Sequence, residues 1–217
     1  RNPKGPTAEG AAAFRDELRG LGRRSEARFA DLTDKAAVGE LMEEVEAAFG
    51  RLDVLVLNAA RAPFKETTRL LERDLRQLVE TNLMAPLFCV QKALPLLETE
   101  GGDVVFISSL GSRFMNPQYP LGPMKAAMES MTRQWAEELR PRGIRANAVC
   151  AGLVKTDAYK TLRRLWKGLE ELPEELFVTP EEVAGVVSFL TRPESAAVSG
   201  QTIVADRGLS NRILRGS

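Results

Sequence analysis

The sequence predicts a doubly wound α/β fold, in which parallel strands alternate with helices that cover both faces of one sheet. Three apolar runs of strand length, at 52–60, 103–110 and 144–152, are separated by segments whose apolar residues recur three and four positions apart. Runs that are apolar almost throughout are typical of parallel strands buried on both faces. The alternation of strand and helix favours right-handed crossovers between parallel strands. We therefore expect one domain over residues 1–217.

The elements before residue 100 are predicted from periodicity and from residues that begin or end helices. Asp34 can cap the second helix, and Gly50 stops it because a left-handed residue after a helix is usually glycine. In chain order we expect a helix at 7–21, a strand at 25–32, a helix at 34–49, a strand at 52–60, and a helical region at 67–97 that is interrupted near 81–86.

The elements after residue 100 continue the same alternation. Thr179, followed by Pro180 and two acidic residues, is a clear helix start. In chain order we expect a strand at 103–110, a loop rich in proline and glycine, a helix at 124–139, a strand at 144–152, an amphipathic helical excursion at 157–176, a helix from Thr179, and a last strand within 200–208.

Composition and charge exclude several functional classes. Lysine plus arginine and aspartate plus glutamate each number 30, so the net charge is zero, whereas binders of nucleic acid or of a membrane surface need a positive excess. The chain has no histidine, which excludes Ser-His and Cys-His nucleophiles and His-ligated metals. Its two cysteines, without a C-x-x-C, favour a reducing cytoplasm. We therefore expect no metal, no nucleic acid and no membrane partner.

Several short motifs follow one another along nearly the whole chain. They are Ala-Asp-Leu at 30–32, the run at 50–60, Asn82, Ile-Ser-Ser at 107–109, Tyr119 with Lys125, the run at 151–156 and the run at 200–208. With these motifs the chain resembles the short-chain dehydrogenase/reductase family. The resemblance implies a Rossmann-like fold, a nicotinamide cofactor and oxidoreductase activity.

The family pattern also begins with a strand, a glycine-rich turn, a helix and a second strand. Such turns hold phosphates by close backbone approach at a helix N-terminus, and no substitute lies between Arg1 and Ala30. We therefore expect the fold to lack its N-terminal β-α-β unit, with roughly 40 residues absent ahead of Arg1.

The resemblance implies that Tyr119 stabilises the charge that develops on the substrate oxygen, and that Lys125 lowers the pKa of this phenol and holds the cofactor ribose. Most members place tyrosine four residues before lysine, where this chain has Leu121. The enoyl-acyl-carrier-protein reductase branch places it seven before, and here the gap is six. Because six residues on one helix point about 240° apart, we expect Tyr119 in a loop and a helix that starts near Pro123.

Two further residues complete the implied catalytic group. Ser109 lies ten residues before Tyr119, which is the spacing of the enoyl reductase branch, although ketoreductases use a serine here to orient a carbonyl. Its alternative role is to end the strand. Asn82 is implied to bond the main chain and anchor a water in a proton relay to Lys125. Alternatively, Asn82 is a polar helix residue whose hydrogen bonds are made to backbone groups alone.

The resemblance also implies which residues hold the cofactor. Asp31 would accept a hydrogen bond from the adenine, and Thr156 would bind the nicotinamide carboxamide or a phosphate. Arg1 would pair with a 2′-phosphate, which favours NADPH while NADH stays possible. The expected cofactor-binding residues are Arg1, Asp31, Leu32, Asn58, Ala59, Lys125, Gly152, Val154 and Thr156.

We interpret the sequence as an NADPH-dependent reductase of the 2,3 double bond of an enoyl thioester, most similar to the enoyl-acyl-carrier-protein reductase branch. The substrate would be a free or carrier-protein-bound acyl thioester. One alternative is a ketoreductase or alcohol dehydrogenase in which Ser109 binds the carbonyl, and another is a non-catalytic relative. The resemblance further implies a substrate lid at about 157–176 and a homotetramer built through the helices near 67–97 and 123–140.

Overall fold

A parallel sheet of four strands organises the computed structural model, which describes residues 6–114, 119–156, 159 and 172–212. The strands lie in chain order, β1 (Val54–Leu57), β2 (Gly102–Ser109), β3 (Ile144–Ala151) and β4 (Thr202–Ala205). Each strand pairs in parallel with the next. All four carboxyl ends therefore meet at one edge of the sheet, which is where ligands bind in folds of this kind.

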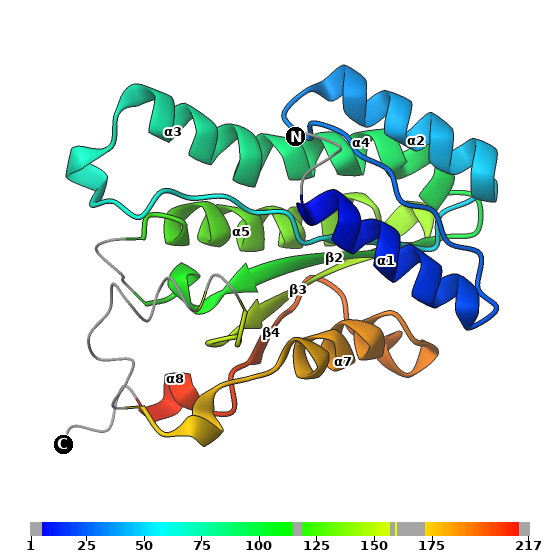
Figure 1. The fold of residues 1–217 in the computed structure, drawn as a ribbon. Helices are drawn as coiled ribbons and strands as arrows, with labels where there is room; N and C mark the ends of the chain where they lie inside the picture. The colour runs from blue at the N-terminus through cyan, green and yellow to red at the C-terminus, as the bar shows by residue number, and fades with distance from the viewer. Residues whose placement is uncertain (1–5, 115–118, 157–158, 160–171, 213–217) are drawn as a thin grey trace.

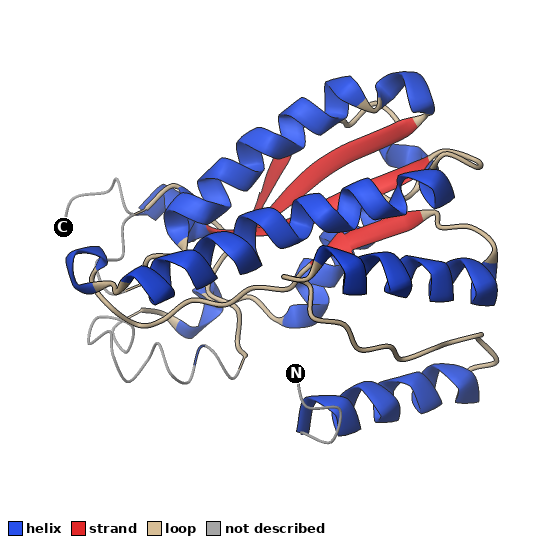
Figure 2. Ribbon diagram, turned by 90° about the horizontal axis from the view of Figure 1, so that it is seen from above, coloured by secondary structure: helices blue, strands red, loops and turns tan. Residues whose placement is uncertain are grey.

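Helices cover both faces of this sheet, as the sequence predicts. Figure 1 shows α3 (Glu72–Val79), α4 (Ala85–Leu97) and α5 (Gly122–Glu138) on one side and α7 (Pro180–Leu190) on the other. α2 (Lys35–Phe49) packs on α4. Figure 2 shows α1 (Pro6–Gly20) at the outside of the molecule. A short helix, α8 (Leu209–Arg212), follows β4.

The core lies in two layers, one on each face of the sheet. Val104 and Phe106 of β2 belong to the cluster under α4 and α5, whereas Val105 belongs to the cluster under α7 together with Val149 and Leu190. Successive strand residues point to opposite faces. Burial on both faces therefore explains why the middle of β2, residues 104–107, is apolar at every position.

Three of the predicted helix boundaries are confirmed. The Asp34 carboxylate accepts a hydrogen bond from the Ala36 amide at 2.8 Å and begins α2. Gly50 ends α2 with φ of 77°, a conformation that glycine adopts without the clash of a Cβ. Thr179 begins α7 through a reciprocal capping box with Glu182.

The strand predicted at 25–32 is wrong. This segment has no ladder partner among the described residues, and a strand exists only through its ladder. Its backbone carbonyls are used differently, because Arg19 donates to the Ser25 oxygen at 2.9 Å and Arg28 donates to the Ala27 oxygen. Phe29 is half exposed, so the alternating pattern here does not pack against a core.

Other predicted elements differ in length from the observed ones or lie outside the described residues. The strand predicted at 52–60 is only four residues long, as is the last strand. The lid expected at about 157–176 falls mostly on residues that the structure does not describe, and so does Arg1. Among the described residues, no helix combines the length and apolarity needed to cross a membrane.

The start of α5 is fixed by contact between two glycines. A Cβ added to Gly122 would lie 2.1 Å from the carbonyl oxygen of Gly111, in the turn that follows β2. We expect Gly122→Ala to lower the free energy of unfolding by about 1–3 kcal/mol, because backbone must move to admit one methyl group. Urea denaturation measures this change.

Gly185 is the matched control for this prediction. It lies inside α7 with no atom within 4 Å of an added Cβ. Gly185→Ala should therefore raise the free energy of unfolding by about 0.5–1 kcal/mol, since alanine loses less backbone entropy in a helix. Equal effects of the two substitutions would contradict the argument from close approach.

Candidate active site

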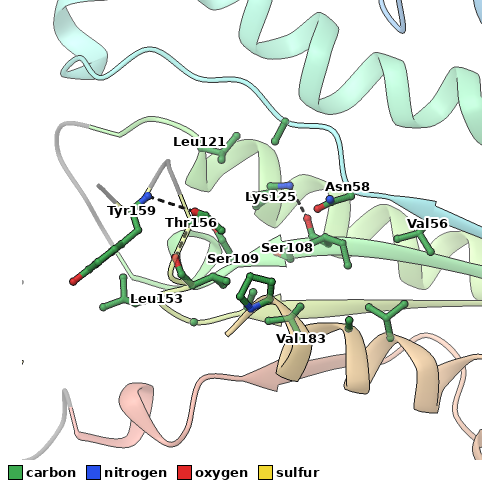
Figure 3. A pocket seen from close by; sticks show the side chains of 18 of the residues that line it. Val56, Asn58, Ser108, Ser109, Leu121, Lys125, Leu153, Thr156, Tyr159 and Val183 are labelled. Carbon is green, nitrogen blue, oxygen red and sulfur yellow. Dashed lines mark hydrogen bonds between the residues drawn. The ribbon is translucent and has the colours of Figure 1, made fainter. Parts of the chain in front are cut away.

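A cavity of about 490 Å³ opens at the carboxyl ends of β1, β2 and β3. Strand ends, the start of α5 and the segment after β3 supply its polar groups, whereas α7 supplies apolar side chains (Figure 3). The polar groups that line it are Asn58, Ser108, Ser109, Tyr119, Lys125, Thr156 and Tyr159.

The structure brings together most of the expected site residues. Those that line the cavity are Ser109, Tyr119, Lys125, Asn58, Gly152, Val154 and Thr156. Those that lie outside its lining are Asn82, Asp31, Leu32 and Ala59. Three of the four candidate catalytic residues, Ser109, Tyr119 and Lys125, thus line one cavity, whereas the fourth, Asn82, does not.

Lys125 lies in the first turn of α5 and is almost fully buried, with 4% of its surface exposed. Its ammonium donates a hydrogen bond to the carbonyl oxygen of Ile107 at 2.6 Å and lies 4.5 Å from the centre of the Phe106 ring. Burial lowers the pKa of Lys125 to about 8, and the nearby Glu129 carboxylate partly opposes this shift. The amine is therefore poised to change protonation near neutral pH.

Tyr119 lies in the loop before α5, as predicted from its spacing to Lys125. Its ring stacks on Phe64, with centroids 4.8 Å apart and an interplanar angle of 16°. Burial raises the pKa of Tyr119, while the Lys125 ammonium donates to the Ile107 carbonyl. The lowering of this pKa by Lys125 that the resemblance implies stays a prediction.

Leu121 also lines the cavity, one helical turn before Lys125 (Figure 3). A leucine cannot donate a hydrogen bond. The phenol contributed from this side of the cavity is therefore that of Tyr119, which comes from the loop.

Asn82 is buried in a π-helical turn (Glu80–Met84) that interrupts the helix between α3 and α4, which confirms the predicted interruption. Its amide accepts from the Arg61 N–H at 3.0 Å and donates to the carbonyl oxygens of Arg61 at 2.6 Å and Leu78 at 2.9 Å. The expected bonds to main chain are confirmed. The water relay to Lys125 remains a proposal.

Glu129 is a residue of the site that sequence reasoning missed. It lies one turn after Lys125 on α5 and is 8% exposed. Its Oε1 accepts hydrogen bonds from Ser108 at 2.5 Å and from Ser112 at 2.6 Å, so it ties α5 to the end of β2. The signal available in the sequence was an acidic residue four positions after the candidate lysine, because such residues share a helix face.

We expect Glu129→Leu to lower the free energy of unfolding by about 2–4 kcal/mol, since the buried hydroxyl of Ser108 and the partly buried hydroxyl of Ser112 lose their acceptor and Lys125 loses a nearby counter-charge. Glu129→Gln is the control, because its amide oxygen can still accept, and it should cost less. Urea denaturation of both variants tests the ranking. A larger loss for glutamine than for leucine would contradict it.

Gly152 shows why the chain turns sharply at the end of β3. A Cβ here would lie 2.8 Å from the Cα of Asp206, so only glycine lets the two segments approach this closely. Beyond it, Val154 forms an isolated bridge with Val178, and Thr156 Oγ1 accepts from the Tyr159 amide at 3.4 Å. These contacts place the hydroxyl of Thr156 at the cavity rim.

The family model described as enoyl-(acyl carrier protein) reductase matches residues 7–210. The chain is a short-chain dehydrogenase/reductase. The members of this family are NAD(P)-dependent oxidoreductases, and the parallel sheet flanked by helices is their Rossmann-like fold. The Rossmann-like fold expected from the motifs is thus confirmed.

Two curated relatives show what kinds of reductase this short-chain dehydrogenase/reductase is similar to. The 3-oxoacyl-acyl-carrier-protein reductase of Thermotoga maritima is 34% identical over 197 residues, which cover 89% of this chain and 80% of that protein. The 1-cyclohexenylcarbonyl-CoA reductase of Streptomyces collinus is 36% identical over 188 residues, which cover 83% of this chain and 67% of that protein.

A solved structure agrees with these relatives. The actinorhodin polyketide ketoreductase with NADPH is 29% identical and superposes with a TM-score of 0.85 over 94% of this chain and 84% of that one. Together the relatives establish an oxidoreductase related to fatty acid synthesis enzymes. They do not support the enoyl expectation as well as they support reduction of a carbonyl.

The residues at the cavity fit the nicotinamide half of NAD(P)H. Lys125 offers an ammonium for ribose hydroxyls, Thr156 offers a hydroxyl, and Gly152 leaves the backbone open beside the cavity. At the other end, Asp31 accepts from the amide and hydroxyl of Thr33 at 3.0 and 2.7 Å, which makes it part of a turn. Leu32 packs against the core, and Ala59 is exposed.

Proposed function

We propose that this protein reduces an acyl thioester with NADPH as the cofactor, and that the group it reduces is the carbonyl of a 3-oxoacyl chain. The observation that carries the proposal is that Ser109, Tyr119 and Lys125 line one cavity at the carboxyl ends of the strands. Two hydroxyl donors and one ammonium are the groups that a carbonyl reduction needs. The 3-oxoacyl reductase of Thermotoga maritima and the polyketide ketoreductase support the same chemistry.

Each side chain has a defined part in this reaction. When bound, the cofactor supplies a hydride to the carbonyl carbon. The hydroxyls of Ser109 and Tyr119 donate hydrogen bonds to the carbonyl oxygen, where negative charge develops, and Tyr119 gives up its proton to that oxygen. Lys125 holds positive potential beside the phenol and binds the ribose. Donors fixed in advance of the reaction stabilise such charge because they need not reorganise.

Reduction of an enoyl thioester is the second candidate, and a specific observation favours it. Leu121 occupies the position one turn before Lys125, so the phenol comes from a loop rather than from the helix. An enolate oxygen needs one phenol donor, and this arrangement provides it without Ser109. The resemblance to the 1-cyclohexenylcarbonyl-CoA reductase, whose name describes an unsaturated thioester, agrees with this candidate.

A direct comparison of substrates separates the two candidates. NADPH oxidation is followed with acetoacetyl and crotonyl thioesters, each presented on coenzyme A and on acyl carrier protein. Turnover of the acetoacetyl thioester with little turnover of the crotonyl thioester is the expected result. Turnover of the crotonyl thioester alone would replace the proposal by the enoyl candidate, and no turnover of either would overturn both.

Cofactor preference and assembly are further parts of the proposal. NADPH is preferred over NADH if Arg1 pairs with the 2′-phosphate, and the ratio of kcat/KM values for the two cofactors tests this. Leu71, Leu75 and Met84 are exposed apolar residues on the α3–α4 side, which supports contact with further copies of the chain there. We propose that the assembly is a homotetramer. Light scattering measures the number of chains in the oligomer.

The two cysteines bear on localisation. Cys89 and Cys150 are buried and form no disulfide, which agrees with a cytoplasmic protein.

A further inference from the structure

The position of Tyr119 raises the question of what holds its ring. A tyrosine on a helix is oriented by the helix itself, whereas Tyr119 precedes α5 and is followed by Pro120 and Leu121. The contact that the structure shows for its ring is the parallel stack on Phe64, at 4.8 Å between centroids. Phe64 comes from the loop after β1, far from Tyr119 in sequence.

The loop that carries Phe64 is itself held on both sides. Three residues before Phe64, the backbone N–H and carbonyl of Arg61 both bond to the buried Asn82 amide, at 3.0 and 2.6 Å. One residue after it, the Lys65 ammonium donates to the Asp74 carboxylate at 2.7 Å. A buried amide and a partly buried ion pair thus fix the Phe64 ring against the body of the protein.

Asp74 connects this loop to the helix that follows. Its carboxylate also accepts from the Leu71 amide at 3.1 Å, where it takes part in the cap of α3. The ion pair to Lys65 and this backbone bond both hold the pKa of Asp74 below its usual value. The carboxylate is therefore charged at neutral pH, which is the state that the ion pair to Lys65 requires.

We propose that Phe64 is a positioning residue for Tyr119, whose stacked ring fixes the plane of the phenol at the cavity. The inference rests on the proposed function of Tyr119 as the donor to the substrate oxygen. It also gives Asn82 a part in catalysis that differs from a water relay, because Asn82 anchors the loop on which Phe64 stands. The inference requires an aromatic ring at position 64, although Phe64 is not among the residues that line the cavity.

Kinetic constants give the first test. Phe64→Leu should lower kcat about 10- to 100-fold with KM little changed, because a small misplacement of a reacting group carries a cost of that order. Phe64→Trp should restore most of kcat, since it restores the stack. Phe14→Leu, an exposed phenylalanine on α1, is the control and should leave kcat unchanged. Phe64→Met gives a second variant of similar bulk in case the leucine variant folds poorly.

Fluorotyrosine NMR gives a second test that does not depend on activity. The chain has two tyrosines, so Tyr119→Phe assigns both fluorine resonances. Loss of the stack in Phe64→Leu should move the Tyr119 resonance towards its position in the unfolded chain and leave that of Tyr159 in place. A Tyr119 resonance that does not move would overturn the inference, and so would a moved resonance with unchanged kcat.

The two tests also separate this inference from the proposed function. A wild-type protein that reduces neither thioester would overturn the proposed function, whatever the resonances show. An active wild-type protein in which tryptophan at position 64 fails to restore kcat, although it restores the resonance, would overturn the inference alone.

Discussion

Replacing Tyr119 by phenylalanine should lower kcat at least about 100-fold, because one preorganised donor to the developing oxyanion disappears. Cofactor affinity should change little, since the cofactor contacts assigned to the cavity belong to other residues. The ring and its stack on Phe64 remain in this variant, so the loss reports the hydroxyl alone. Steady-state kinetics with NADPH, together with the dissociation constant from cofactor fluorescence, measure both effects.

Tyr159 provides the control for this substitution. It lines the same cavity, but Figure 3 shows its hydroxyl end directed away from Lys125 and Ser109. Its ring makes an edge contact with Phe177, with centroids 5.1 Å apart. Tyr159→Phe should therefore keep kcat near that of the wild type. If Tyr159→Phe is inactive and Tyr119→Phe is active, the assignment of the phenol is reversed.

Replacing Lys125 by methionine should abolish activity and yet stabilise the fold at pH 7. The pKa of Lys125 is about 8 in the folded chain and about 10.5 in the unfolded chain. Keeping the buried amine charged therefore costs the folded state about 3 kcal/mol. Loss of the hydrogen bond to the Ile107 carbonyl offsets about 1 kcal/mol of that gain. We therefore expect the free energy of unfolding to rise by about 2 kcal/mol.

The pH dependence of the free energy of unfolding gives a further test of this prediction. Between pH 8 and about 10.5 the unfolded chain binds more protons at Lys125 than the folded chain, so wild-type stability rises with pH across that window. The advantage of Lys125→Met should shrink over the same window. Urea denaturation at several pH values measures the difference, and Lys92→Met, at an exposed lysine of α4, is the control. A difference in the free energy of unfolding between Lys125→Met and the wild type that grows with pH would contradict the argument that burial lowers the pKa of Lys125.

Much of the fold could be predicted because burial leaves a strong pattern in the sequence. The stretch 104–107 is apolar at every position because β2 is covered by α5 on one face and α7 on the other. The caps at Asp34 and Thr179 could be predicted because one side chain satisfies nearby backbone groups. The segment 25–32 shows the limit of such patterns, since strand propensity without a ladder partner leaves a segment extended but unpaired.

The candidate site was predicted less completely, and the reason is distance along the chain. The placement of Tyr119 in a loop followed from local residues, because Pro120 and Pro123 restrict where a helix can begin. The stack on Phe64 and the bonds of Glu129 to Ser108 join residues that are far apart in sequence. No local periodicity encodes such contacts, and the lowered pKa of Lys125 depends on the burial that they create.

The two sides of the cavity differ in the contacts that support them. On the α5 side, backbone meets backbone at Gly111 and Gly122, and a buried carboxylate joins helix to strand. On the α7 side, Val183 and Val187 contribute apolar side chains alone. Selection for longer, shorter or branched substrates would therefore act on these valines, and laboratory redesign of acyl specificity has its best starting point there.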